Sequence, residues 1–289
     1  MTKDPRIPQI AVLGGLLAWG QWGLDFALDP AVSLAIFAAA FTTQALGARF
    51  VRHEPFDPRS PLISALSLCL LLRTASPLVA AAAAFLAIGS KFVLQRGGKH
   101  WFNPTNFALV AALLCFEGVW VSSGQWGTTV WLVFAIACAG PLVLRRAARS
   151  DVTWAFLACH AGTLIARALW LGDPVAIPLH SLGSGALLIF AFFMISDPRS
   201  TPDSRTGRLA FAACVSATGL WLQLGWYEPN GLLYALALCA PLVPIFDHVL
   251  PAARFAWAAP RGENHVSAPA PPCRHPAGRP DRLAPARVG

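Results

Sequence analysis

The chain has 289 residues, of which 56% are hydrophobic and only 12% carry a charge. A soluble domain carries about 25% charged residues, so this composition excludes an ordinary soluble protein and indicates one that crosses a lipid bilayer several times. The formal net charge of +8 raises the question of nucleic acid. The basic residues lie in short clusters between apolar segments, which is the pattern of cytoplasmic loops, so we expect no nucleic-acid partner.

Ten hydrophobic passages follow one another along the chain. A full span needs ~20 apolar residues, and two passages are clearly shorter, which fits half-helices that meet in the protein interior. These two are the passage at 61–73, which ends on Arg73, and the one at 103–119. No small-residue cleavage site follows the first passage, so we expect a spanning helix there and no signal peptide. The passages are 8–28, 31–50, 61–73, 77–95, 103–119, 127–144, 151–171, 176–196, 207–225 and 231–249.

Basic residues gather between alternate passages, which predicts the orientation in the membrane. The loops rich in Lys and Arg belong in the cytoplasm together with the N-terminus. The outer loops are short and almost free of basic residues, apart from Arg73 and Arg167, whose long side chains can reach the membrane surface. We therefore expect an even number of spans and both termini inside. The basic residues expected inside are Lys3, Arg6, Arg49, Arg52, Arg59, Lys91, Arg96, Lys99, Arg145, Arg146, Arg149, Arg199, Arg205 and Arg208.

Two polar segments interrupt the apolar pattern. The first, RGGKHWFNPTNFAL at 96–109, contains two glycines that loosen the backbone and Pro104, which lacks a hydrogen-bond donor. The second, SDPRSTPDSRTGR, lies at 196–208 after an apolar run. Irregular polar backbone survives at membrane depth only where it is buried in protein or lines a cavity. Two such breaks in corresponding halves therefore predict a binding site.

The end of the chain differs from the rest. Residues 1–255 are expected to form the membrane domain, and residues 256–289 a disordered, basic, Pro-rich cytoplasmic tail. Six of the seven cysteines lie in apolar runs and none forms a CxxC pair, so we interpret them as small buried hydrophobes and expect no metal site.

Three motifs in order make the chain resemble a known membrane family. They are Gly97–Gly98 followed by Phe102-Asn103-Pro104, the run FFMISDPRSTP at 192–202, and Asn230-Gly231-Leu232-Leu233 followed by the late Pro241, Pro244, Phe246, Asp247 and His248. Together they are similar to the family that contains RnfD, a membrane component of the Rnf electron-transport complex, and NqrB, a membrane component of the sodium-translocating NADH:quinone reductase.

The resemblance implies an all-α polytopic membrane fold. About ten transmembrane passages would form two five-helix repeats with broken helices, roughly 1–126 and 127–255, in a urea-transporter-like arrangement around a cavity. It also implies a flavin, FMN or riboflavin. In the family an FMN is attached to a Thr in an S/T-G-A-T motif, and Gly127-Thr128-Thr129 occupies the matching place here, with Thr129 as the candidate acceptor. Trp126 stands where that motif has Ser or Thr, so Thr128 and Thr129 equally fit residues that cap the next helix.

The first break has the chemistry to hold such a cofactor. The helix that starts near Asn103 offers free amide donors at its N-terminus, with Lys99 and His100 close by, and these attract an anionic flavin phosphate or the charge of a reduced ring. Asn103 and Asn106 are expected to hydrogen-bond the ring edge. The alternative is that both asparagines only satisfy backbone groups that the break has freed.

The second break offers Asp197, for which two interpretations stand. An ionisable residue at membrane depth is a candidate for ion or cofactor handling. Asp197 also suits a cap for the next helix or a partner for Arg199.

We therefore expect a flavin-associated electron-transport subunit of the RnfD type in the bacterial inner membrane, coupled to ion transport in its complex. It would be an electron-transfer subunit, with flavoprotein and iron–sulfur subunits as partners, or a stand-alone relative of one, rather than a complete enzyme. One alternative is a channel or transporter for a small polar solute that uses the same fold. Another is a scaffold whose partners carry all the redox centres.

Overall fold

Helices make up most of the chain in this computed structural model, which describes residues 4, 6–26, 28–121 and 150–254. All of them lie in one structural unit, Lys3–Trp257. The first group of elements is α1 (Arg6–Gly23), α2 (Pro30–Gly47) with its π-helical extension η1 (Ala48–Arg52), α3 (Arg59–Leu71), α4 (Pro77–Val93) and α5 (Pro104–Cys115).

Three of these helices start with the same two-residue device, a capping side chain followed by proline. Asp29 accepts a hydrogen bond from the Ala31 amide at 2.7 Å, Ser76 from the Val79 amide at 3.4 Å, and Asn103 from the Asn106 amide at 3.0 Å. The side chain satisfies an amide that the helix leaves without a partner, and proline at the next position loses nothing because its missing N–H would be unpaired there.

Within the described residues, four short strands accompany the helices. Strand β1 (Leu72–Thr74) pairs antiparallel with β4 (Val119–Val121), and β2 (Gln95–Arg96) pairs with β3 (Lys99–His100). Gly97 and Gly98 form the turn of the second pair with φ of 58° and 80°, values that residues with a Cβ rarely adopt. The polar break folds into a hairpin because its backbone groups must find partners once the helix has ended.

The second group of elements lies beyond residue 149. It consists of α7 (Ser150–Leu171), α8 (Ala176–Leu182), α9 (Gly185–Ile189) with its π-helical extension η3 (Phe190–Met194), α10 (Arg205–Gly225), α11 (Gly231–Cys239), η4 (Ala240–Leu242) and α12 (Val243–Val249). Between α8 and the α9–η3 segment the chain bends by 51°.

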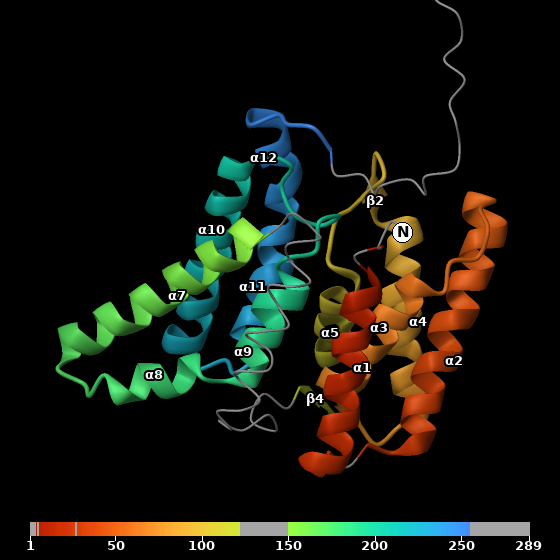
Figure 1. The fold of residues 1–289 in the computed structure, drawn as a ribbon, viewed down its shortest axis with the longest axis horizontal. Coiled ribbons are helices and arrows are strands. Elements are labelled where there is room, and N and C mark those ends of the chain that lie inside the picture. The colour runs from red at the N-terminus through yellow and green to blue at the C-terminus, as the bar shows by residue number, and fades with distance from the viewer. Residues whose placement is uncertain (1–3, 5, 27, 122–149, 255–289) are drawn as a thin grey trace, which may run out of the picture. The chain divides into compact units, whose positions relative to one another are not determined.

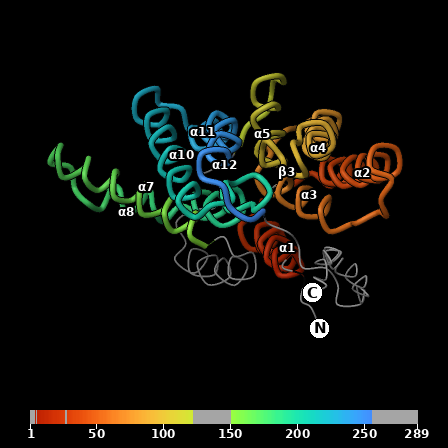
Figure 2. The backbone as a smooth tube through the Cα atoms, turned by 90° about the horizontal axis from the view of Figure 1, so that it is seen from above, coloured from red at the N-terminus to blue at the C-terminus, as the bar shows by residue number. Residues whose placement is uncertain are grey.

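Helix packing divides these elements into two groups that meet at α5 and α11. In the first group α4 packs along α2 and α5, and in the second α10 packs along α7 and α11 (Figure 1). Seen from above, α5 lies between α4 and α11 (Figure 2). Four alanines of α4 are fully buried, and their small side chains let the neighbouring backbones approach closely. They are Ala80, Ala83, Ala84 and Ala87.

Three helices in the described part of the chain are long and apolar enough to cross a membrane, and the bent pair 176–182 and 185–194 makes a fourth if it counts as one span. The two passages that are expected to be short are short helices, since α3 has 13 residues and α5 has 12. The expected passage at 127–144 and the tail at 256–289 lie outside the described residues.

Candidate functional site

The two breaks, far apart in the sequence, meet in space. The His100 amide donates a hydrogen bond to the Arg199 carbonyl oxygen at 3.0 Å. The Asn103 side-chain amide donates to the Met194 carbonyl oxygen at 3.1 Å. The first bond joins β3 to the second break, and the second joins the cap of α5 to the end of η3.

Asn103 and Asn106 are both buried, and both serve the backbone. Asn103 caps α5 through its carbonyl oxygen and satisfies Met194 through its amide. The Asn106 amide donates to the Leu233 carbonyl oxygen at 3.1 Å, which ties α5 to α11. The side-chain oxygen of Asn106 has no hydrogen-bond partner among the described residues. Both asparagines therefore satisfy backbone groups near the break, which is the alternative role that the sequence suggested for them.

Asp197 organises the second break from within. Its carboxylate accepts hydrogen bonds from the Arg199 amide at 3.1 Å and the Ser200 hydroxyl at 3.0 Å. Its carbonyl oxygen accepts one from the Thr201 hydroxyl at 3.0 Å. Helix α10 begins at Arg205, and its cap is Ser204, whose hydroxyl accepts from the Gly207 amide at 3.0 Å. Asp197 therefore binds Arg199 through the backbone and does not cap the next helix.

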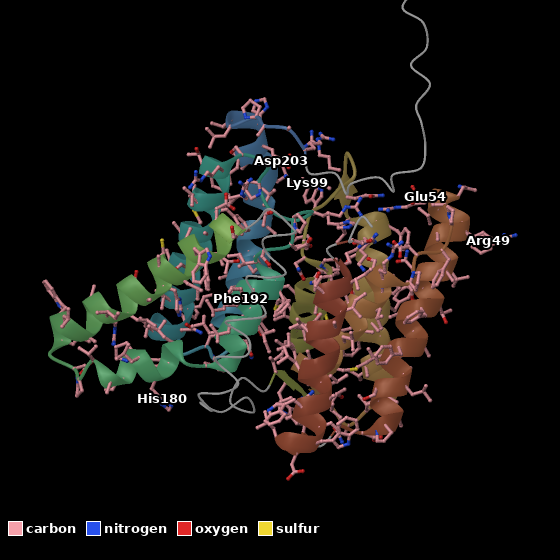
Figure 3. The ribbon with its side chains drawn as sticks, in the orientation of Figure 1. Arg49, Glu54, Lys99, His180, Phe192 and Asp203 are labelled. Atoms are coloured by element: carbon pink, nitrogen blue, oxygen red, sulfur yellow. The ribbon has the colours of Figure 1, made fainter. Side chains whose placement is uncertain are left out.

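Lys99 is engaged in an ion-pair network. Its ammonium lies 3.1 Å from an Asp203 oxygen and 2.5 Å from an Asp247 oxygen. The Asp203 amide also donates to Asp247 at 2.8 Å. Figure 3 shows Lys99 and Asp203 next to one another in the upper part of that view. Lys99 thus links β3, the second break and α12, and this use of its charge competes with the predicted role in holding a flavin phosphate.

A cavity of about 350 Å³ lies where the two breaks meet. Its walls come from the starts of α1, α3 and α5, the ends of α2 and α4, and the second break. His100, Asn103 and Asp197 line it, whereas Lys99 and Asn106 do not. Its other charged and polar walls are Arg6, Gln9, Gln44, Arg52, Glu54, Asp57, Ser60, Ser64, Ser67, Lys91, Thr105, Ser196 and Arg199, and its aromatic walls are Phe92, Phe192 and Phe193.

Lys91 is a wall residue whose importance the sequence analysis missed. It is 7% exposed, and its ammonium donates to the Ser60 hydroxyl at 2.9 Å and the Ser64 hydroxyl at 3.1 Å. A lysine is almost never this buried without a charged partner. The orientation rule counts Lys91 only as ordinary loop charge. The signal that points to it is the spacing of Ser60, Ser64 and Ser67 in an apolar helix, which places three hydroxyls on one face.

Four charges at the rim of the cavity neutralise one another. Arg6 pairs with Asp4 at 2.8 Å and Asp57 at 2.6 Å, and Arg59 pairs with the same two carboxylates. Burial raises the pKa of both carboxyls, but the hydrogen bonds and charges of the two arginines outweigh burial and leave each pKa below its usual value. The cluster connects the start of α1 to the start of α3.

His100 is a neutral wall of the cavity. Burial, followed by the positive charges of Arg199, Lys91 and Arg52, lowers the pKa of His100 to about 3. Its Nδ1 atom is buried and has no hydrogen-bond partner among the residues that the structure describes. The side chain therefore offers a ligand an uncharged imidazole.

The remaining candidates lie elsewhere. Thr128 and Thr129 lie outside the described residues, so the predicted attachment site has no structural description. His160 is buried in α7 and stacks on Phe156 with the ring centroids 5.4 Å apart, as a histidine in a packed core does. His180 is an exposed residue of α8, away from the breaks (Figure 3).

Comparison with known proteins supports the resemblance. A family model described as NQR2, RnfD, RnfE family matches residues 118–256, which include the second break but not the first. The D-type subunit of the ion-translocating oxidoreductase complex of Citrobacter koseri is 30% identical over 136 residues, and that of Escherichia coli strain K12 is 32% identical over 138 residues. Each match covers 46% of this chain and 37% of the relative. Over residues 118–256, just under half of its length, the chain is thus similar to the NQR2, RnfD, RnfE family.

Proposed function

We propose that this chain is a D-type subunit of a bacterial ion-translocating oxidoreductase complex, and that it holds a flavin in the cavity between its two breaks. The subunit type rests on the family match and on the names of the relatives. The observation that carries the flavin site is the cavity itself, because both predicted breaks line it. The names of the relatives give no support to the alternative of a solute channel or transporter.

The packing supports two inverted repeats. Helices α2, α4 and α5 pack in the same order as α7, α10 and α11. Helix α4 ends at the cavity, where Lys91 lines it, whereas α10 begins beside the second break. We infer that the two groups are related by a reversal of direction across the membrane. The two five-helix repeats, with 127–144 completing the second, belong to this proposal.

We also propose an inner-membrane location with the cavity end and both termini in the cytoplasm. Residues expected inside lie together at this end. Arg52 donates to the Gln95 side chain at 2.8 Å, and Arg208 pairs with Asp151 at 2.5 Å. The segments expected outside meet at the other end, where β1 pairs with β4. Positive residues on the cytoplasmic side are the general rule for membrane proteins.

The walls of the cavity fit a flavin. The volume of about 350 Å³ lies within the ~300–1,000 Å³ of ligand pockets. Phe192 and Phe193 offer apolar surface to a ring system, and the partnerless Nδ1 of His100 and the capping Asn103 offer polar contacts to its edge. A bound flavin would supply electron transfer, while these residues would position it and exclude water.

Covalent FMN at Thr129 is a separate part of the proposal. Covalent attachment rests on the resemblance alone. It does not compete with the cavity site, because one chain could hold one flavin in the cavity and a second at this threonine. Partner subunits that carry flavin and iron–sulfur centres likewise rest on the family.

The proposal is tested by purifying the full chain in mild detergent and recording its visible absorption. The protein is then denatured and separated on a gel. Flavin that leaves the protein on denaturation supports the cavity site. Fluorescence that stays with the band and disappears in Thr129→Ala, but not in Thr128→Ala, supports attachment at Thr129. A protein that neither contains nor takes up FMN or riboflavin contradicts the flavin part, and the subunit then acts as a scaffold for redox partners.

A further inference from the structure

Four cations line the cavity, and within the described ranges no carboxylate contacts the charged groups of three of them, Arg52, Lys91 and Arg199. The Lys91 ammonium hydrogen-bonds there to serine oxygens alone. The Arg52 guanidinium donates to the Lys91 carbonyl oxygen at 3.3 Å and to Gln95, and it lies 5.2 Å from the centre of the Phe92 ring. The Arg199 guanidinium makes no hydrogen bond or ion pair with any described residue, although Arg199 lines the cavity.

These three side chains converge on one place although they come from three elements. Arg52 lies in η1, Lys91 in α4 and Arg199 in the second break. The Arg52 guanidinium reaches the backbone of Lys91, and the Arg199 carbonyl oxygen holds the His100 amide. All three charges act on the same buried imidazole of His100. Like charges repel at such range, so their gathering costs energy unless an anion lies among them.

Within the described residues, the carboxylates outside this group of cations do not supply that anion. Asp4 and Asp57 are neutralised by Arg6 and Arg59. Asp203 and Asp247 share Lys99, and Asp151 pairs with Arg208. The segment 122–149, outside the described residues, contains no Asp or Glu.

Two acidic residues remain among the described walls of the cavity. Glu54 is exposed to solvent, which weakens its charge, but it lines the cavity and acts on Arg199. Asp197 contributes one negative charge, and its oxygens already accept hydrogen bonds from the Arg199 amide and from Ser200. Among the described walls of the cavity, Arg52, Lys91 and Arg199 thus face Asp197 and the exposed Glu54, an excess of one positive charge.

We propose that Arg52, Lys91 and Arg199 form a phosphate-binding site, which takes the phosphate of a monoester such as FMN or free inorganic phosphate. A phosphomonoester carries about −1.5 to −2 charges at neutral pH, so the excess of positive charge attracts it. Two guanidinium groups present paired donors that suit phosphate oxygens, and the ammonium adds a point charge. The expectation that this phosphate site prefers FMN to riboflavin rests on the proposed flavin site. The expectation that it binds inorganic phosphate does not.

Arg199→Gln is the sharpest variant because the guanidinium has no partner in the described fold to lose. Arg49→Gln is the matched control: Arg49 lies in the same helical segment as Arg52, is exposed, does not line the cavity, and points away from it in Figure 3. Lys91→Met is a second test, accompanied by a measurement of thermal unfolding, because its loss also frees two serines.

The first experiment titrates the purified, flavin-free chain with FMN and with riboflavin and follows flavin fluorescence. FMN is expected to bind about tenfold more tightly than riboflavin or better, since a charge-assisted hydrogen bond is worth at least this factor. Arg199→Gln should weaken FMN binding about tenfold, leave riboflavin binding unchanged, and differ from Arg49→Gln. Equal affinities of FMN and riboflavin in the wild-type chain would overturn the preference for FMN.

The second experiment separates the phosphate site from the flavin proposal. Thermal unfolding is measured with inorganic phosphate and with sodium chloride at equal ionic strength. Phosphate is expected to raise the unfolding temperature of the wild-type chain and of Arg49→Gln, but not of Arg199→Gln. If neither flavin binds while this shift is present, the flavin site fails and the phosphate site stands. No shift with phosphate, together with equal binding of FMN and riboflavin, would overturn the site.

Discussion

The two breaks reach the same cavity, but they are held in different ways. The first folds on itself as a backbone hairpin, in which Gln95 pairs with His100 and Arg96 with Lys99. The second has no such pairing among the described residues, and one residue, Asp197, accepts hydrogen bonds from four groups of the residues 199–201. The first break therefore depends on its turn and on its contacts with neighbours, whereas the second depends on a single residue, through both its carboxylate and its backbone carbonyl. The contacts that join the two breaks offer the most sensitive test of this comparison.

Lys99→Met should produce the largest effect, because Lys99 joins the first break to the second. The substitution leaves the Asp203 and Asp247 carboxylates facing the same space without their shared cation. Removing one partner of a buried ion pair costs about 3–5 kcal/mol, and partial exposure reduces this here to about 2–4 kcal/mol of unfolding free energy. Thermal or denaturant unfolding in detergent measures it. Lys99→Met with Asp247→Asn should recover part of the loss, and a single variant as stable as wild type would show that the pairs contribute nothing.

Asn103→Leu comes next, because it removes two hydrogen bonds at once. Loss of the helix cap costs about 1 kcal/mol, and the buried Met194 carbonyl left without its donor adds about 1–2 kcal/mol. The same unfolding measurement applies. Asn103→Asp keeps the capping oxygen and loses only the donor, so it should fall between wild type and Asn103→Leu. Equal stability of the two variants would argue against the cap.

Burial of the neutral His100 predicts a pH dependence. Its pKa is about 3 in the folded chain against 6.5 for an ordinary histidine. Below pH 6.5 the unfolded chain therefore takes up a proton that the folded chain refuses, so stability is full above pH 6.5 and falls as the pH drops toward 3. Between pH 7 and pH 5 the contribution is about 1–2 kcal/mol.

His100→Gln should flatten this part of the pH profile, and the exposed His248 offers the control His248→Gln, which should leave it unchanged. Unfolding free energies at several pH values between 7 and 5 provide the measurement. An equal slope in wild type and His100→Gln would mean that the imidazole takes up its proton freely in the folded chain.

Gly98→Ala should give the smallest effect, since no atom lies within 4 Å of the added Cβ and only the backbone angle, φ +80°, is strained. The expected cost is about 1 kcal/mol. Gly89→Ala in α4 also meets no atom within 4 Å, but its backbone is helical, so it should be neutral or slightly stabilising. If both substitutions had the same effect on the unfolding temperature, the hairpin turn would not need its glycine.

Local chemistry made the breaks predictable, and distance in the sequence made their partners unpredictable. Gly97, Gly98 and the Asn103-Pro104 pair mark the first break because of what their backbones allow. Lys99 was correctly placed near the break, but its carboxylate partners lie more than 100 residues further along the chain, and no local pattern reveals them. Prediction of which charges meet requires the packing of whole helices.

The cavity walls show the same limit. His100, Asn103 and Asp197 were predicted because they lie in the breaks, and they do line the cavity. Lys91, Arg52 and Arg199 were interpreted as loop charge, because the rule for orienting membrane proteins counts basic residues without regard to what they face. The serine face of α3 was the available signal, and it becomes meaningful once Lys91 is known to lie against it.

The central claim is that the cavity between the breaks holds a flavin, and the most direct test is to fill that cavity. Ser67 lines it and is 9% exposed, so Ser67→Phe places a ring in its interior. Thr163→Phe on the exposed side of α7 is the control. The measurement is the amount of flavin released on denaturation per chain, with thermal unfolding to confirm that each variant is folded. The account predicts that flavin is lost from folded Ser67→Phe and retained by Thr163→Phe. Full retention of releasable flavin by folded Ser67→Phe would contradict it.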